Sequence, residues 1–262
     1  MPFLNHNFET LKVSVCDRVA LVTMANPPVN AMSQVMSDEL TLVMDLITNL
    51  DDVHAVVLTG AGKVFCAGAD LKTRATSMAA PGGLPALSRR SRECFHAIRE
   101  CSKPVVAAVN GAALGSGLAI VASSDVIFAS TDAVIGLPEI DVGLLGGCRH
   151  AMRLFGHSRL RRMALTGYRV PAEELYRQGI IEECVPSDEL LSVSMAFAQL
   201  IASKSPTSIR MSKHTLNVIE DMSLRDGYRY EQDMTAQLAL SEDAAEAQLA
   251  FKEKRAPNFV GR

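Results

Sequence analysis

Two glycine-containing segments, each placed directly after a short apolar run, are the part of this sequence best suited to chemistry. They span residues 64–71 (VFCAGADL) and 110–117 (NGAALGSG). Glycine at the end of a strand lets the backbone turn tightly and leaves N–H groups that no side chain covers. Two such turns directed at one point could hold an oxyanion, and Glu139 in the segment 136–141 (GLPEID) could move the proton that forms or quenches it. These residues predict enolate or acyl chemistry on a carbonyl group.

Other catalytic motifs are incomplete in this sequence. Residues 115–120 (GSGLAI) begin like a dinucleotide-binding fingerprint but have isoleucine in place of the third glycine. Residues 60–63 (GAGK) are followed by valine instead of the Ser or Thr of a phosphate-binding loop. Ser116 has leucines, not glycines, two residues away on each side, so the nucleophile-elbow pattern fails. The six histidines show no metal-binding spacing, and we expect no metal site.

Length and composition narrow the class of protein. A chain of 262 residues, 48% of them hydrophobic, can bury the core of one large domain or of a domain with an appendage. A net charge of −3 and only 5% aromatic residues argue against a nucleic-acid partner. The six cysteines form no CxxC pair, which is typical of reduced thiols in a cytoplasmic protein. Residues 1–10 show no secretion signal.

The uncharged run over residues 104–124 is long enough to suggest a membrane span. It is interrupted by Asn110, three glycines and Ser116, and Asp125 follows at once. A buried strand, a turn and a buried helix explain this pattern better than a membrane segment does. We therefore expect no membrane association.

Hydrophobic periodicity predicts alternating strands and helices in the first half of the chain. Strands are expected at 8–15 and 18–25, which form a hairpin, and at 55–58, 105–109, 126–129 and 133–136. Helices are expected from the N-cap Ser33 to Leu50, at 86–101, and after the second glycine turn to residue 123. Residues 77–85, rich in small residues, Gly and Pro, are predicted to form a mobile loop. Further along, the pattern is purely helical, over 195–203, 208–220, 224–240 and 244–254.

The order strand, glycine turn, helix recurs about every 45 to 50 residues, which predicts a coiled stack of β-β-α units instead of a simple Rossmann sheet. We expect an α/β body over residues 1–186 and a helical region over residues 187–262. Such a helical region packs on its own body or on a neighbouring subunit.

Five segments, in the correct order, resemble the motifs of the crotonase (enoyl-CoA hydratase/isomerase) superfamily. They are residues 26–32 (NPPVNAM), 65–72 (FCAGADLK), the turn 111–117, 138–140 (PEI) and 252–259 (KEKRAPNF). The similarity runs nearly end to end. It implies an α/β spiral of repeated β-β-α units, a C-terminal helical trimerisation region, and assembly as a homotrimer or homohexamer. It also implies an acyl-CoA substrate, whose coenzyme A is part of the substrate, and no separate cofactor.

The resemblance implies a role for each matching residue. By position, the backbone N–H groups of Ala69 and Ser116 would form the oxyanion hole, and Glu139 would transfer a proton next to the thioester carbonyl. An apolar setting after Leu137 and Pro138 would raise the pKa of Glu139 by desolvation, which suits proton transfer.

Substrate-binding positions also follow from the resemblance. They are Val29, Ala67, Gly68, Asp70, Leu71, Lys72, Gly115 and Lys254. Asp70 is the residue least expected to take part in the reaction, because it is better placed to cap the segment that follows it. Lys72 and Arg74 are candidate partners for the coenzyme A phosphates, as is Lys254 across a subunit boundary.

The sequence departs from the family pattern at three places. Ala119 stands where the two-glutamate hydratases carry their other glutamate, and alanine cannot activate water. Ser116 stands where the family usually has glycine. The segment 143–148 is shorter than the common pattern and runs into the unusual trio Cys148-Arg149-His150. We therefore expect a non-standard pocket beside Glu139.

Several interpretations stay open at this point. Asp141 could supply the missing carboxylate, because it shares a face with Glu139 in an extended segment, or it could be a solvated loop acid. Cys148 and His150 could form a thiolate nucleophile, or a buried thiol beside a helical histidine. We favour proton transfer by Glu139 alone, as in double-bond isomerisation, or a hydratase-type addition with a substituted base. The alternatives are thioester hydrolysis and non-catalytic binding of an acyl-CoA, and the acyl group itself is undefined.

Overall fold

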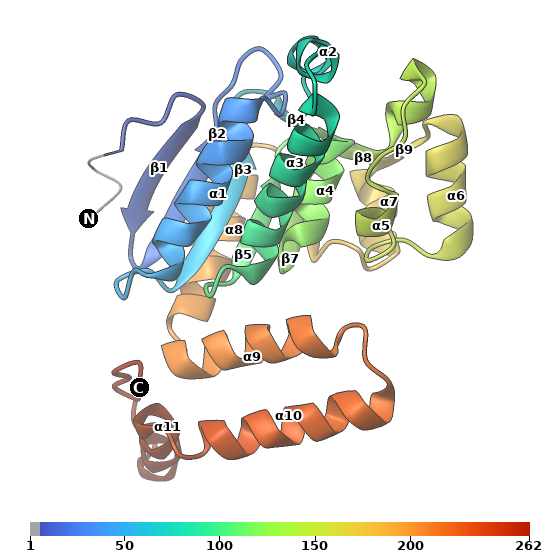
Figure 1. Ribbon diagram of the computed structural model, residues 1–262. Helices are drawn as coiled ribbons and strands as arrows, with labels where there is room; N and C mark the ends of the chain where they lie inside the picture. The colour runs from blue at the N-terminus through green and yellow to red at the C-terminus, as the bar shows by residue number, and fades with distance from the viewer. Residues whose placement is uncertain (1–5) are drawn as a thin grey trace.

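The computed structural model describes residues 6–262, except for the side chains of residues 77 and 78. Two sheets organise the body (Figure 1). The larger has the strand order β1-β2-β3-β5-β7-β10, and the smaller has the order β4-β6-β8-β9. The strands of the larger sheet are β1 (Leu11–Cys16), β2 (Val19–Met24), β3 (Ala55–Gly60), β5 (Val105–Val109), β7 (Val126–Ser130) and β10 (Glu183–Val185). Those of the smaller are β4 (Val64–Cys66), β6 (Ala112–Leu114), β8 (Val134–Gly136) and β9 (Arg169–Pro171).

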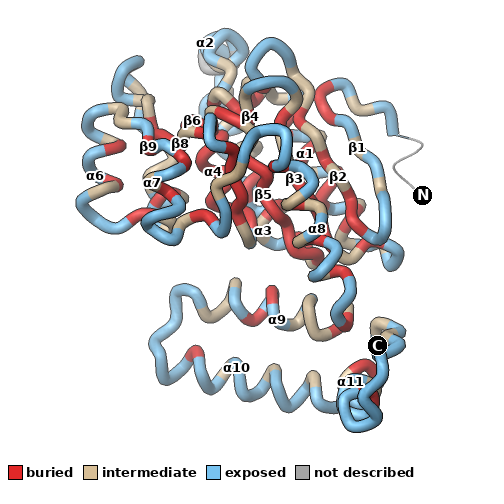
Figure 2. The backbone as a smooth tube through the Cα atoms, turned by 180° about the vertical axis from the view of Figure 1, so that it is seen from behind, coloured by how far each residue is buried: buried red, intermediate tan, exposed pale blue. Residues whose placement is uncertain are grey.

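The central strands of the larger sheet are buried on both faces, as Figure 2 shows for β3 and β5. Parallel strands covered on both sides are apolar at nearly every position. Because successive side chains point to opposite faces, Val56 and Leu58 of β3 join one core cluster, whereas Ala55 and Val57 join another. Helices α1 (Gln34–Thr48) and α3 (Gly83–Glu100) contribute to the first cluster, and α8 (Leu190–Ala202) contributes to the second.

The chain passes repeatedly from the larger sheet to the smaller one and then into a helix. Strands β3, β5 and β7 of the larger sheet are each followed by β4, β6 and β8 of the smaller one. The helices after these pairs are α2 (Leu71–Ala79) with α3, α4 (Ser116–Ser123), and the 3₁₀ helix η2 (Pro138–Val142). This alternation is the spiral of β-β-α units that the sequence predicted. Between η2 and β10 lie α5 (Cys148–Ala151), α6 (His157–Thr166) and α7 (Ala172–Arg177).

Most predicted elements are present with bounds shifted by a few residues. Helix α1 begins after Ser33, whose hydroxyl accepts a hydrogen bond from the Met36 N–H (3.1 Å), as an N-cap should. The loop predicted over residues 77–85 is wrong in extent, because α2 runs to Ala79 and α3 starts at Gly83. Pro85 is compatible with α3 because it lies in the first turn, where backbone N–H groups have no helical partner.

The last helices lie outside the α/β body. In Figure 1, α9 (Pro206–Ile219), α10 (Leu224–Leu238) and α11 (Glu242–Glu253) form a separate group beneath it. Lys213 of α9 connects this group to the body, because its Nζ lies 2.7 Å from the carboxylate of Asp125 and donates to the Lys103 carbonyl (3.1 Å). Across residues 6–262 no helix combines the length and the hydropathy that a membrane crossing requires.

Candidate active site

Three neighbouring strands of the smaller sheet bring the predicted catalytic residues together. Strand β6 pairs in parallel with β4 on one side and with β8 on the other. The carboxyl ends of parallel strands meet at one edge of a sheet, where ligands of such sheets bind. Ala69 follows β4, Ser116 follows β6, and Glu139 follows β8. The topology therefore explains why residues far apart in sequence share one site.

The amide of Ala69 has no hydrogen-bond partner within residues 6–262, because of the way its segment is held. The Met32 N–H donates to the Gly68 carbonyl (2.8 Å), and the Asp70 N–H donates to the Met32 carbonyl (3.1 Å). Because alternate N–H groups of an extended segment point to opposite sides, the intervening Ala69 N–H faces away from Met32. Gly68 has φ +105°, a conformation that favours glycine and turns the chain before this amide.

The amide of Ser116 is also unpaired in the part of the chain that the structure describes, because Ser116 is the first residue of α4. The first bond within this helix runs from the Ala119 N–H to the Gly115 carbonyl (3.0 Å), and the Gly115 N–H itself donates to Gly136 of β8 (3.0 Å). The opening N–H groups of a helix have no partner inside it and carry the positive end of the helix dipole. A Cβ added at Gly115 would lie 3.8 Å from Cα of Gly68, so the two glycine turns are in contact.

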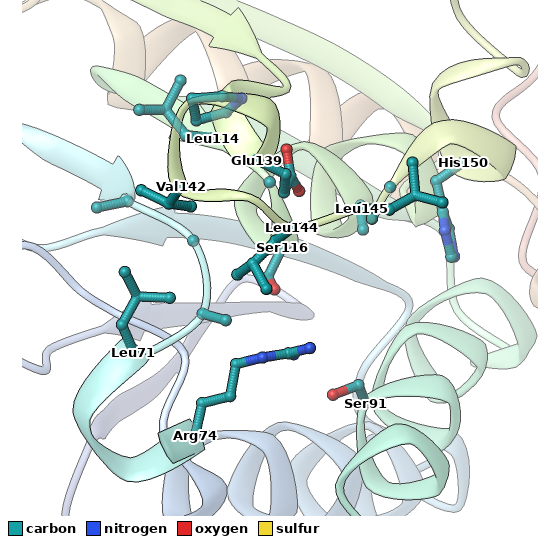
Figure 3. Close-up of a pocket in the computed structure, with 18 of the residues that line it drawn as sticks. Leu71, Arg74, Ser91, Leu114, Ser116, Glu139, Val142, Leu144, Leu145 and His150 are labelled. Atoms are coloured by element: carbon teal, nitrogen blue, oxygen red, sulfur yellow. The ribbon is translucent and has the colours of Figure 1, made fainter. Parts of the chain in front are cut away.

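These turns border a cavity of about 590 Å³. Figure 3 shows its labelled side chains, with Glu139 on one side and Arg74 on the opposite side. The walls come from the two turns, from η2 and the segment that follows it, and from one face each of α2 and α3. The lining residues include Ala67, Gly68, Ala69, Leu71, Arg74, Ser88, Ser91, Phe95, Gly115, Ser116, Ala119, Glu139, Asp141, Leu144, Leu145 and His150.

Glu139 is placed at the turn that carries the Ser116 amide. Its Oε2 is buried and has no hydrogen-bond partner within residues 6–262, and desolvation raises the pKa of its carboxyl group. Its Oε1 lies so close to the backbone that a Cβ added at Gly115 would be 2.8 Å from it, and one added at Gly146 would be 3.2 Å from it. An unpartnered carboxylate beside a free amide is suited to exchanging a proton with a substrate bound there.

No second carboxylate faces Glu139 from α4. Ala119 is buried one helical turn after Ser116 and contributes only a methyl group to the cavity wall. Asp141 is exposed at the margin, and its Oδ2 lies 2.6 Å from where a Cβ at Gly167 would be. The extended segment expected for Glu139 and Asp141 is wrong, because both lie in the 3₁₀ helix η2, where residues two apart point in different directions. Asp141 nevertheless lines the cavity, so its role as a second carboxylate stays a prediction.

His150 and Cys148 do not pair in the described structure. The His150 ring packs against that of Phe95 with centroids 5.0 Å apart, and burial, helped by nearby cationic groups, lowers its pKa. The Cys148 thiol instead donates to the Gly146 carbonyl (3.7 Å). The arrangement therefore favours a packed histidine and a separate thiol over a thiolate nucleophile.

The predicted substrate-binding residues fall into two groups. Ala67, Gly68, Leu71 and Gly115 line the cavity. Val29 holds the first turn in place by accepting a hydrogen bond from the Ala67 N–H (3.1 Å). Asp70 caps α2, since its side chain accepts from the Lys72 N–H (3.0 Å), and its interactions with Thr73 and Lys72 lower its pKa.

Of the three candidate phosphate-binding cations, Lys72, Arg74 and Lys254, only Arg74 lines the cavity. Lys72 is exposed on α2, outside the cavity lining. Lys254 follows α11, which belongs to the helical group beneath the α/β body (Figure 1), and it does not line the cavity either. Arg74 instead projects into the cavity (Figure 3). Helical geometry explains the difference, because residues 71 and 74 share one face of α2 and residue 72 does not.

Sequence reasoning missed the wall that α3 provides. Ser88, Ser91, Arg92 and Phe95 all line the cavity. Their spacing of three, four and seven residues places them on one face of a helix, a signal that was readable from the sequence. The described residues hold no group of three or more His, Cys, Asp or Glu side chains able to bind a metal ion.

Comparison with known proteins gives a consistent result. The sequence model of the enoyl-CoA hydratase/isomerase family matches residues 15–262. The chain is 38% identical over 245 residues to (7aS)-7a-methyl-1,5-dioxo-2,3,5,6,7,7a-hexahydro-1H-indene-carboxyl-CoA hydrolase of Rhodococcus jostii, covering 92% of this chain and 93% of that protein. It is 31% identical over 256 residues to 2,3-dehydroadipyl-CoA hydratase of Escherichia coli, covering 96% of this chain and 99% of that protein.

A solved structure agrees with these sequence matches. The crystal structure of enoyl-CoA hydratase from Bacillus anthracis superposes with a TM-score of 0.91 and 29% identity, covering 97% of this chain and all of that one. The similarity thus extends over both the α/β body and the helical region. The chain belongs to the enoyl-CoA hydratase/isomerase family.

Proposed function

We propose that this protein is an acyl-CoA-processing enzyme that stabilises a thioester enolate. The Ala69 and Ser116 amides would hold the thioester oxygen, and Glu139 would carry the proton. The observation that supports this most directly is the meeting of these two free amides and one unpartnered carboxylate oxygen at a single cavity. Its relatives named as hydratases and hydrolases of CoA thioesters support the same substrate class. Coenzyme A belongs to the substrate, and the reaction needs no separate cofactor.

The two amides can supply a large part of the catalysis. One preorganised donor to a developing oxyanion is typically worth about 3–4 kcal/mol of transition-state stabilisation. The Ser116 amide also benefits from the dipole of α4, which stabilises negative charge at the N-terminus of a helix. A carboxyl group with a raised pKa can then accept and return a proton near neutral pH.

A single carboxylate favours reactions in which one group removes and returns the proton. Double-bond isomerisation is such a reaction, and Glu139 could carry it out alone. Hydration needs a group that activates water, and Ala119 cannot be that group, so a substituted base such as Asp141 would be required. A non-catalytic binder would have no use for a buried carboxylate directed at the ligand.

Thioester hydrolysis is the second candidate function. Two relatives at 38% identity, from Rhodococcus jostii and Mycobacterium tuberculosis, are named as hydrolases of an oxygenated bicyclic CoA thioester. The same pair of amides would stabilise the oxyanion that forms when water attacks the carbonyl carbon. Release of the free thiol of coenzyme A distinguishes this reaction from isomerisation and hydration.

The test is to incubate the protein with 2-enoyl- and 3-enoyl-CoA thioesters, to follow the acyl products by mass spectrometry, and to measure free thiol. Glu139→Gln should lower turnover by about 10²–10⁴-fold, because it removes the proton carrier. The matched control is Glu173→Gln on the exposed surface of α7, which should retain full turnover. Unchanged turnover in Glu139→Gln would show that another group carries the proton.

We also propose a homotrimer or homohexamer in the cytoplasm, with no nucleic-acid or membrane partner. Large apolar side chains stand exposed on and beside the outer helices, including Leu224 (91%), Leu240 (88%) and Phe251 (88%). Exposed apolar side chains at this density are typical of surfaces that another subunit covers. A neighbouring subunit would also be the means by which Lys254 reaches a coenzyme A phosphate.

A further inference from the structure

Arg74 places a positive charge in the part of the cavity that faces the catalytic residues. It lies three residues after Leu71, on the face of α2 that lines the cavity. Figure 3 shows its side chain running from α2 across the cavity toward Ser91 of α3, with Glu139 on the far side. The cavity wall on the α2 side is therefore cationic, whereas the carboxylates of Glu139 and Asp141 belong to η2 on the opposite side.

The Arg74 side chain lacks the partners that other arginines of this chain have. Its Nε is buried and makes no hydrogen bond within the described residues, and no carboxylate of those residues forms an ion pair with it. Arg90, in contrast, pairs with Asp38 at 2.6 Å, and Arg99 pairs with Glu220 at 2.7 Å. A buried donor without an acceptor costs free energy, so a ligand that supplies the acceptor would bind with an advantage.

The surroundings of Arg74 select the kind of ligand group. Ser91 presents a hydroxyl group from the facing helix, and Leu71 and Phe95 add apolar surface to the same cavity. Arg92 adds a second cation at this wall, although its Nε lies 3.6 Å from Glu93 and its side chain is more than half exposed. A guanidinium beside a hydroxyl donor is the arrangement that binds a carboxylate, because arginine presents a planar fork of donors to two oxygens.

We infer that Arg74, with Ser91, binds a carboxylate at the end of the acyl group remote from the thioester. This inference rests on the proposed function, since it requires the thioester at the Ala69 and Ser116 amides. The preferred substrates are then CoA thioesters of dicarboxylic acids. The other anion available is a phosphate of coenzyme A, but the buried Nε and the inward direction of the side chain place the charge inside the cavity.

The test compares three saturated thioesters of equal chain length that offer no double bond for turnover. They are adipyl-CoA, hexanoyl-CoA and the monomethyl ester of adipyl-CoA, each titrated calorimetrically with the protein. Adipyl-CoA should bind at least tenfold more tightly than the other two. In Arg74→Met this preference should vanish and hexanoyl-CoA should bind more tightly than before, whereas Arg74→Lys should keep part of the preference. Arg89→Met, on the exposed side of α3, is the matched control and should behave as the wild type does.

Each contrary outcome has a distinct meaning. Equal binding of all three thioesters by the wild type would refute the carboxylate site and leave the proposed function intact. If adipyl-CoA and its methyl ester both bound more tightly than hexanoyl-CoA, recognition of a charged carboxylate would be refuted. The site would then recognise a neutral carbonyl group. An equal loss of affinity for all three thioesters in Arg74→Met would indicate that Arg74 binds a phosphate of coenzyme A. If no thioester bound at all, the proposed function itself would fail. The wild-type comparison decides the question even if the Arg74 variants fold poorly.

Discussion

The carboxyl group of Glu139 is held where its charged form is disfavoured, because burial raises its pKa and no donor satisfies Oε2 in the described structure. If the ionised form removes a substrate proton, kcat/KM should rise with pH through this raised pKa. The rising limb should then lie at higher pH than an ordinary glutamate would give. A pH–rate profile with the best enoyl-CoA substrate measures it. If the rising limb gave the pKa of an ordinary glutamate, or if it persisted in Glu139→Gln, the titrating group would be another residue.

Ala119 defines the second prediction at this scale. Its methyl group lines the cavity where no second carboxylate stands, so hydration of a simple substrate such as crotonyl-CoA should be slow. Losing one member of an acid–base pair typically costs about 10²–10⁴-fold in rate. Ala119→Glu should raise hydration if the short segment 143–148 leaves room for a water molecule.

The control for that experiment is Ala119→Glu in a protein that already carries Glu139→Gln, where the gain should disappear. Fast crotonyl-CoA hydration by the unmodified protein would contradict the prediction. Asp141, at the margin of the same cavity, would then be the first residue to substitute.

At the scale of the elements, Asn30 holds the segment before α1 in its conformation. This residue is buried, adopts φ +52°, and donates from Nδ2 to the carbonyls of Ala61 (2.9 Å) and Val64 (2.7 Å). It thereby fixes the segment that bridges to Ala69 through Met32. Asn30→Ala removes two hydrogen bonds to part-buried carbonyls and places alanine at a positive φ, so it should lower the free energy of unfolding by about 2 kcal/mol.

Urea denaturation measures that loss, and kcat/KM should fall with it because the Ala69 amide is displaced. Asn49→Ala is the matched control, since the exposed Asn49 side chain donates to the Asp45 carbonyl near the end of α1 and to no other described residue. Equal stability of the two variants would show that Asn30 does not hold this segment.

The elements themselves were predicted well where burial is complete. Strand β5 has the predicted bounds, because an uninterrupted apolar run leaves few alternatives for a short buried strand. The family was also predicted, as was the meeting of the two glycine turns with Glu139, since turn glycines and Glu139 carry local sequence signals. The catalytic roles of these residues stay a prediction. Helix α2 was not predicted, because its small residues and the Pro-Gly pair after them are typical of loops. The direction of Arg74 could not be predicted without that helix.

At the scale of the whole molecule, Lys213 fastens the outer helices to the body. Its Nζ is buried against Asp125 (2.7 Å), which also accepts the Val105 N–H (2.7 Å) at the start of β5. The Lys213 end of this ion pair is buried, whereas Asp125 is exposed and stays solvated when its partner is removed. Lys213→Met loses the ion pair and the hydrogen bond to the Lys103 carbonyl, and should destabilise the protein by about 1–2 kcal/mol. Urea denaturation, with the exposed Lys204→Met as control, tests this. Equal stability would mean that apolar contacts alone dock α9.

The outer helices also carry the prediction of an oligomer. Light scattering should give a mass of three or six chains in solution. Leu240→Glu and Phe251→Glu together should shift the population toward smaller species, because charge is costly at a covered apolar contact. A stable monomer in the unmodified protein would contradict this assembly, and it would also remove the proposed route by which Lys254 reaches the substrate.

The packing of Glu139 against Gly146 has an evolutionary consequence. A methyl group at position 146 would lie 3.2 Å from Oε1 of Glu139, and the backbone there does not require glycine. The demand for glycine therefore comes from the acid, and substitutions at the two positions should be non-additive. In a lineage that lost Glu139, alanine could become fixed at 146 without this close contact. The loss would then become hard to reverse, since restoring glutamate would also require restoring glycine.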